Sequence, residues 1–186
     1  MKNLTRHSFL LALLLLTLFS CIKDSKTVPS LPPATQNGSN VMAARINGSI
    51  WTKFSCTDCI GGGSGLLASF HNGFLQIIGD SINSSKVVSS VEIDVINVTS
   101  TGVYTLGLNN GNPITNYGEI KYQKPGNIIL TYSTDANNKG TITITKLDVI
   151  KHIISGTFSF DASNTDNPSD LKHITEGRFD VPYIFE

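Results

Sequence analysis

The sequence predicts an all-β protein: a single antiparallel β-sandwich or barrel of about ten strands, which follows a signal peptide and a tether. Three observations predict this class. From residue 41 onward, apolar and polar residues alternate with a period of two, as in half-buried strands. Turn-forming residues separate these segments at intervals of about 8–14 residues. No segment of about 10–15 residues has helical periodicity, which disfavours a parallel α/β sheet.

Residues 1–20 have the pattern of a secretory signal peptide. Lys2 and Arg6 precede the segment 9–19, which is apolar except for one threonine. The segment is too short to span a bilayer, because a transmembrane helix needs about 20 apolar residues. We therefore expect export from the cytoplasm.

The end of the signal segment distinguishes two kinds of export signal. An ordinary signal peptidase prefers small residues at positions −3 and −1, but Leu18 would occupy −3. Leu18, Ser20 and Cys21 instead resemble a bacterial lipobox. That resemblance implies cleavage before Cys21, a diacylglyceryl group on its thiol and acylation of its new amine with a chain such as palmitate. Two or more chains anchor a protein stably, since each buried methylene contributes about 0.8 kcal/mol.

Residues 21–40 are interpreted as the lipidated cysteine and a disordered tether. The stretch 22–40 holds three prolines and five Ser/Thr residues. As a coil it spans about 25 Å, so the domain is expected to stand off the membrane. Ile22-Lys23-Asp24 partly resembles the signal that directs Bacteroidetes-type lipoproteins to the cell surface. The predicted location is the cell envelope, on the periplasmic or surface-exposed face of the outer membrane.

Residues 41–186 are long enough for one domain with its own core. The chain has 14 Lys and Arg and 14 Asp and Glu, and loss of residues 1–20 removes two basic residues. The resulting net charge is about −2, and no Lys/Arg cluster is present, so nucleic acid is not an expected partner.

Turn residues delimit the strands that we predict. Asn47-Gly48 separates the first two strands, His71-Asn72-Gly73 the next two, and Lys124-Pro125-Gly126 a later pair. A barrel with this number of strands would be lipocalin-like. In chain order the predicted strands are 41–46, 49–54, 66–70, 74–79, 87–98, 103–108, 119–122, 127–133, 141–150, 153–161 and 171–185.

Alternation assigns faces within several of these strands. Val91, Ile93 and Val95 fall on one face of their strand, and acidic residues fall on the other. The strand 141–150 begins Thr-Ile-Thr-Ile-Thr, the most regular alternation in the chain. We expect 153–161 to pair with the last strand.

Four motifs carry a family resemblance: Asn-Gly-x-x-Trp at 47–51, Gly-x-Ile-x-Ile-Thr at 140–145, Ile-Ser-Gly-Thr-Phe-x-Phe at 154–160, and Ile-Thr-x-Gly-x-Phe-Asp at 174–180. With them the domain resembles an uncharacterised domain family of Bacteroidetes-type lipoproteins. The resemblance covers about 41–186. It implies an all-β fold and a cell-envelope location, but no activity, ligand or catalytic residue.

The motifs also have a structural interpretation. Gly156 and Gly177 lie inside predicted strands, where glycine marks a bulge or a close approach of another group. Phe158 and Phe160 are expected in the core. Trp51 is expected to plug the core or its rim, and its indole N–H then needs a hydrogen-bond partner.

Cys56 and Cys59 form a Cys-x-x-Cys motif. Thioredoxin chemistry would require a βαβ setting, and structural zinc would require four ligands, whereas the chain has no second cysteine pair. In an oxidising envelope a local disulfide is the plainest interpretation, with free thiols as the alternative. The adjoining glycine-rich run 61–65 lacks the residues of a phosphate loop and indicates a turn.

Other polar residues give weaker indications. The oxygen-rich stretch 161–170 could hold calcium, but it departs from the EF-hand pattern and also suits Asx turns. His71, His152 and His173 lie in no recognised catalytic spacing, so no catalytic residue, metal or cofactor is assigned. Asp80-Ser81-Ile82 matches a short O-glycosylation pattern of Bacteroidetes-type envelopes, which makes Ser81 a candidate modification site in a turn-like setting.

These observations predict a non-enzymatic binding or interaction module of the cell envelope. The membrane is the partner of Cys21, and the domain would bind a glycan, a small apolar ligand or another envelope protein. A structural protein without a ligand is the alternative. A hydrolase of envelope or dietary glycans is the third hypothesis, and it requires two convergent titratable groups in a cleft.

Overall fold

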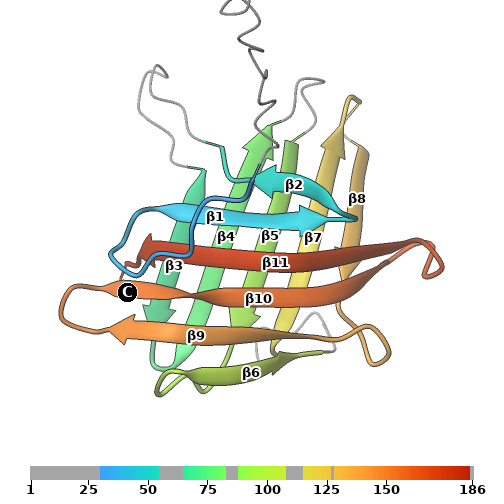
Figure 1. Ribbon diagram of the computed structural model, residues 1–186. Coiled ribbons are helices and arrows are strands. Elements are labelled where there is room, and N and C mark those ends of the chain that lie inside the picture. Colours follow the sequence, from blue (N-terminus) through green and yellow to red (C-terminus); the bar gives the residue numbers. More distant parts are fainter. Residues whose placement is uncertain (1–29, 55–64, 83–87, 108–114, 127, 185–186) are drawn as a thin grey trace, which may run out of the picture.

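The computed structural model describes residues 30–54, 65–82, 88–107, 115–126 and 128–184 (Figure 1). Within these ranges the regular structure is entirely β, which confirms the all-β prediction. The strands are β1 (Val41–Ile46), β2 (Ser49–Thr52), β3 (Leu66–His71), β4 (Phe74–Ile82), β5 (Val88–Val95), β6 (Gly102–Leu106), β7 (Tyr117–Lys124), β8 (Ile128–Ser133), β9 (Gly140–Asp148), β10 (Ile153–Asn164) and β11 (Leu171–Pro182).

All described strands belong to one antiparallel sheet that is strongly curled. Its main order is β2-β1-β11-β10-β8-β7-β5-β4-β3, and β9 pairs with both β10 and β6. The long β10 allows the curl, because residues 153–160 pair with β9 while Ser163 and Asn164 pair with β8. Figure 1 shows the result as two layers, in which β1, β11, β10, β9 and β6 cross in front of β3, β4, β5, β7 and β8.

The two ends of the curled sheet approach each other through the C-terminal segment. Ser69 of β3 forms a parallel bridge with Ile184. The Phe70 N–H donates to the Ile184 carbonyl at 3.1 Å, and the Ile184 N–H donates to the Ala68 carbonyl at 3.0 Å. The arrangement is consistent with the predicted sandwich or barrel.

Apolar side chains fill the concave side of the curl. Phe158 and Phe160 are both 3% exposed, and Val91, Ile93 and Val95 are fully buried, as their alternation predicts. Trp51 is also in the core. Its Nε1–H donates to the Ser89 hydroxyl at 3.0 Å, which satisfies the indole as expected.

The predicted turns form where the sequence places them. Asn47 and Gly48 have φ values of 48° and 80°, and Asn72 and Gly73 have 47° and 79°. Positive φ at both central residues is the geometry of a tight type I′ hairpin turn. The predicted pairing of 153–161 with the last strand is also confirmed, from Ile153 opposite Pro182 onward.

Some boundaries differ from the prediction. The strand β4 continues past Gly79 to Ile82, because Ser81 lies opposite Ser89 and extends the ladder. Gly79 does not end the strand; a Cβ there would lie 2.6 Å from Met42 Sδ and 2.9 Å from Trp51 Cη2. The glycine instead provides room for core side chains.

Candidate functional site

Two adjoining hollows form an open groove where β6 meets β9. Their volumes are about 660 and 500 Å³, and Thr105 and Lys139 line both. We call this feature the β6–β9 groove and define it by Tyr104, Thr105, Asn116, Lys139, Thr141 and Ser159.

The hydroxyl groups of this groove come from β9 and from the two strands that pair with it. Ile142 and Ile144 point into the core, so Thr141 and Thr143 face outward. Register then places Thr105 and Ser159 on either side of Thr141, one from β6 and one from β10. Three hydroxyls from three strands therefore lie in one row.

The hydroxyl surface continues along the sheet. Thr143 lies opposite Thr157, and both line a third, smaller hollow of about 270 Å³. Glu176 and Arg178 line its other side. Each hydroxyl can donate and accept a hydrogen bond, so the face suits ligands with several hydroxyl groups.

Three other polar side chains border the groove. Asn116 accepts from the Ile96 N–H at 2.8 Å and donates to the Thr105 carbonyl at 3.1 Å, which fixes β6 against the end of β5. The Tyr104 hydroxyl donates to the Ser100 carbonyl at 2.8 Å. Lys139, which is exposed, supplies a positive charge. The groove is thus bordered by an amide, a phenol ring and an ammonium group.

A histidine–carboxylate pair lies at the margin of the second hollow. Asp161 lines that hollow, and its Oδ1 is 2.7 Å from His173 Nδ1. The two residues lie opposite each other on β10 and β11, and their side chains are 51% and 58% exposed. The sequence shows both residues, but only the register of the hairpin reveals that they meet.

The outer face of β5 and β7 carries an acidic cluster. Glu92 lies opposite Glu119, and Lys121 Nζ is 3.4 Å from Glu92 Oε2 and 2.5 Å from Glu119 Oε1. Asp94 lies beside them and is only 3% exposed, and among the residues that the structure describes its Oδ1 has no hydrogen-bond partner. The pKa of Asp94 is raised to about 6, chiefly by burial and also by the nearby charge of Glu92, although hydrogen bonds from Tyr117 and Gln76 act to lower it.

The buried Asp94 predicts a stability that depends on pH. Because its pKa is higher in the folded chain, the wild type should lose stability as the pH rises from about 4 through 6. Asp94→Asn should remove this loss and raise the free energy of unfolding at pH 8 by about 1–3 kcal/mol, with little change at pH 4. Urea unfolding across this pH range measures the difference. Asp80→Asn, at an exposed position of β4, is the control and should change the free energy of unfolding at pH 8 by less than about 0.5 kcal/mol. The prediction would be contradicted if the free energies of unfolding of Asp94→Asn and the wild type changed in parallel with pH.

Asp180 accepts five hydrogen bonds from described residues, and it holds the N-terminal segment. Residues 35–39 donate four hydrogen bonds to it: the Thr35 hydroxyl at 2.7 Å and the N–H groups of Asn37, Gly38 and Ser39 at 3.1, 2.9 and 2.9 Å. The Ser155 hydroxyl donates a fifth at 2.7 Å. Burial acts to raise the pKa of Asp180, but these hydrogen bonds outweigh it and hold the pKa well below its usual range.

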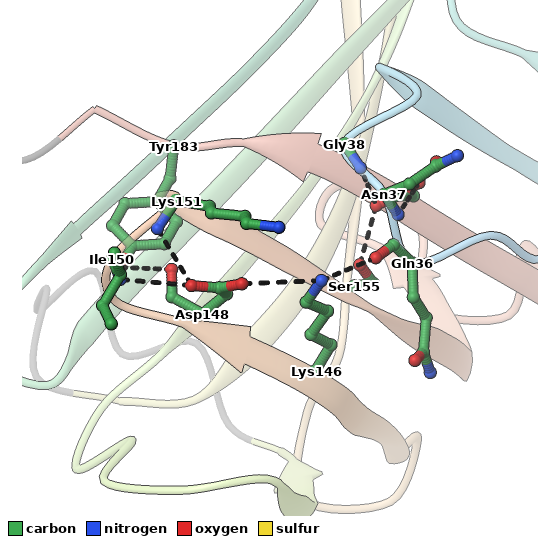
Figure 2. Close-up of polar contacts among 10 residues, drawn as sticks. Gln36, Asn37, Gly38, Lys146, Asp148, Ile150, Lys151, Ser155 and Tyr183 are labelled. Atoms are coloured by element: carbon green, nitrogen blue, oxygen red, sulfur yellow. Dashed lines mark hydrogen bonds and ion pairs between the residues drawn. The ribbon is translucent and has the colours of Figure 1, made fainter.

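Two basic side chains hold the same segment at further points. Lys146 Nζ donates to the Gln36 carbonyl at 2.8 Å, and Arg178 Nη1 donates to the Pro32 carbonyl at 3.0 Å. Figure 2 shows Gln36, Asn37 and Gly38 lying over Lys146 of β9 and Ser155 of β10. Lys146 also pairs with Asp148 at 3.6 Å. We call residues 30–39 the docked segment.

The site residues predicted from sequence fall in different places. Cys21, Cys56 and Cys59 lie outside the described residues. Ser81 lies in β4 and is half-buried opposite Ser89, in a strand and not in the expected turn. Nothing in the sequence around Asp180 predicts its role, because four of its donors come from residues 35–39.

The oxygen-rich stretch 161–170 forms Asx turns. Asn164 Oδ1 accepts from the N–H groups of Asp166 and Asn167 at 2.8 and 3.0 Å. Among the residues that the structure describes, no group of three or more His, Cys, Asp or Glu side chains is placed to hold a metal ion. Within the same residues, no helix is long and apolar enough to cross a membrane.

Comparison with known proteins identifies one family. A family model described as a domain of unknown function (DUF6252) matches residues 66–182. No curated protein and no solved structure matches the chain. The matched region extends from β3 through β11, and it contains the groove, the acidic cluster and Asp180. Because this match covers more than half of the chain, the protein belongs to the DUF6252 domain family.

Proposed function

We propose that the protein is a lipid-anchored protein of a Bacteroidetes-type cell envelope that binds a glycan in the β6–β9 groove. The observation that carries the binding proposal is the outward row formed by Thr105, Thr141 and Ser159. The Tyr104 ring packs toward the core and lines only the adjoining hollow. Sugars offer many hydroxyls, and clefts with a few well-placed polar groups and an aromatic surface orient such ligands. The anchoring part of the proposal rests on Cys21 and its lipobox.

The structure favours a glycan over a small apolar ligand. Apolar ligands need apolar cavities, whereas the concave side of the sheet is filled by side chains such as Leu75, Ile77 and Phe179. The groove is open and is bordered by Lys139, Asn116 and threonine hydroxyls. A polymer can pass through an open groove of this kind, while a small apolar molecule would remain in contact with water.

Glycan binding can be tested with the purified full chain in detergent. An array of envelope and dietary polysaccharides should identify ligands, and calorimetry should then measure affinity. The double variant Thr105→Val/Thr141→Val keeps β-branched side chains but removes two hydroxyls. At about 1 kcal/mol for each lost hydrogen bond, the affinity should fall about 30-fold.

Thr52→Val is the matched control, because Thr52 is an exposed threonine on β2 and lies outside the groove. Its affinity should equal that of the wild type. Failure of every glycan to bind, or equal affinity of the double variant and the control, would reject the groove as a glycan site.

A further inference from the structure

Only eight residues of the sequence separate the docked segment from Cys21. Contacts of the segment with Arg178, Lys146 and Asp180 hold the chain from Pro32 through Ser39. Residues 22–29 separate Cys21 from this segment. Nine chain steps span at most about 30 Å when fully extended. As a coil they span about 15–18 Å. A lipid on Cys21 would therefore keep the domain close to the bilayer.

The docked segment also indicates which end of the domain faces the lipid. In Figure 1 the blue segment begins beside β2, toward the end of the molecule where β4 and β7 finish and β8 begins. From there it passes over the front layer toward the start of β1. A lipid anchor on Cys21 would therefore connect to the domain at the end that contains the last residues of β4 and the β7–β8 turn.

Exposed apolar side chains gather at this same end. Ile82, at the end of β4, is 47% exposed, and Ile128 and Ile129, at the start of β8, are 55% and 57% exposed. Register places Ile82, Val88, Gln123 and Ile129 in one row across the outer face of the back layer. Ile128 is on the other face of β8, because successive side chains of a strand alternate. We call Ile82, Val88 and Ile129 the apolar edge.

The apolar edge is confined to the end of the sheet. The next outward row is polar and consists of Asp80, Ser90, Lys121 and Thr131. Lys124, which is exposed at the adjoining β7–β8 turn, adds a positive charge. Apolar side chains beside a lysine suit the interface of a bilayer with anionic lipids, because the side chains enter the acyl boundary and the ammonium group stays among the headgroups.

We propose that the apolar edge is a membrane-contact surface, which rests on the lipid bilayer when the acylated Cys21 anchors the chain. This inference depends on the anchoring part of the proposed function and is independent of glycan binding. The β6–β9 groove is lined by residues of β6 and β9, at the opposite end of the molecule in Figure 1. Contact at the apolar edge would thus hold the groove away from the membrane and open to polymeric ligands.

Tryptophan fluorescence provides a direct test. The chain has one tryptophan, the buried Trp51, which gives a constant background. Ile129→Trp places a reporter in the apolar edge. Val103→Trp is the matched control, because Val103 is 68% exposed on β6. Each acylated full-length variant is reconstituted in phosphatidylethanolamine–phosphatidylglycerol vesicles that contain brominated lipid. The bromine should quench the added emission of Ile129→Trp at least threefold more than that of Val103→Trp.

Insertion of a 20-residue Gly-Ser linker between residues 29 and 30 provides a second variant. A longer free chain lowers the effective concentration of the domain at the surface, so the quenching of Ile129→Trp should fall at least twofold. Equal quenching of Ile129→Trp and Val103→Trp in floating vesicles would overturn the contact surface, as would quenching that does not change with the linker.

Mass spectrometry of residue 21 separates this result from a failure of the anchor. A diacylglyceryl adduct on Cys21, together with flotation that is lost in Cys21→Ala, supports the anchoring on which the contact surface rests. An unmodified Cys21 in a protein that does not float would reject anchoring, and the contact surface with it.

Discussion

Asp180→Asn should lower the free energy of unfolding at pH 7 by about 2–4 kcal/mol. The carboxylate is 1% exposed and accepts five hydrogen bonds, from Thr35, Asn37, Gly38, Ser39 and Ser155. The amide that replaces it has one acceptor oxygen, and its NH₂ group would face donors. The buried Ser155 hydroxyl or some of the partly buried donors of residues 35–39 would therefore lose their partner, which costs more than the bond itself contributes.

The loss of stability in Asp180→Asn should become smaller as the pH falls. Because the pKa of Asp180 is lowered in the folded chain, its stabilisation is present above the unfolded value near 4 and is lost as the pH falls below it. Denaturant unfolding of the wild type and the variant should therefore converge toward acid pH. Asp166→Asn, at an exposed loop position, serves as the control and should change stability by less than about 0.5 kcal/mol.

Limited proteolysis gives an independent readout of the same substitution. Loss of the Asp180 contacts should release residues 35–39, so a protease should cut the docked segment of Asp180→Asn sooner than that of Asp166→Asn. Wild-type stability together with wild-type cleavage rates would show that Asp180 does not hold the segment.

Gly156→Ala should destabilise the protein by about 3 kcal/mol or more, or prevent folding altogether. A Cβ at this position would lie 2.1 Å from the Thr143 carbonyl oxygen and 2.7 Å from Phe179 Cζ. The first contact involves the backbone of the neighbouring strand β9, which cannot move away without breaking its ladder with β10. The register of β9 and β10 shifts at Ser155 and Gly156, so the bulge itself depends on the missing side chain.

Soluble yield, far-ultraviolet circular dichroism and denaturant unfolding measure the effect of Gly156→Ala. Gly107→Ala is the matched control, because nothing lies within 4 Å of its built Cβ and its φ is not in the left-handed region. The control should lie within about 0.5 kcal/mol of the wild type. Equal stability of the two alanine variants would show that β10 accommodates a side chain at position 156.

The candidate sites were less accessible to sequence reasoning than the fold. Alternation predicts that Thr141 faces outward, but it does not say that Thr105 and Ser159 lie on either side of it. His173 and Asp161 are 12 positions apart in the chain and have no motif in common. Such neighbours depend on strand register, and a shift of one residue would turn each side chain to the other face of the sheet.

In the N-terminal segment, too, the sequence predicts the local character of the chain but not its contacts with the domain. Its prolines and small polar residues predict a tether, since they cannot form a core of their own. Binding by Asp180 requires a buried carboxylate that lies 141 or more positions away in the chain. The composition of residues 30–39 does not predict that they bind Asp180.

Local chemistry alone determined the all-β class, most strand positions, the Asn-Gly turns and the core roles of Trp51 and Phe158. Period-two burial and the preference of Asn-Gly for positive φ act within a few residues and can be read directly. Only the tertiary structure decided that Gly79 continues a strand, that Asp180 holds the docked segment and that three strands align hydroxyls along a groove. Each of these depends on which strands meet and in what register, and that is a property of the whole curled sheet.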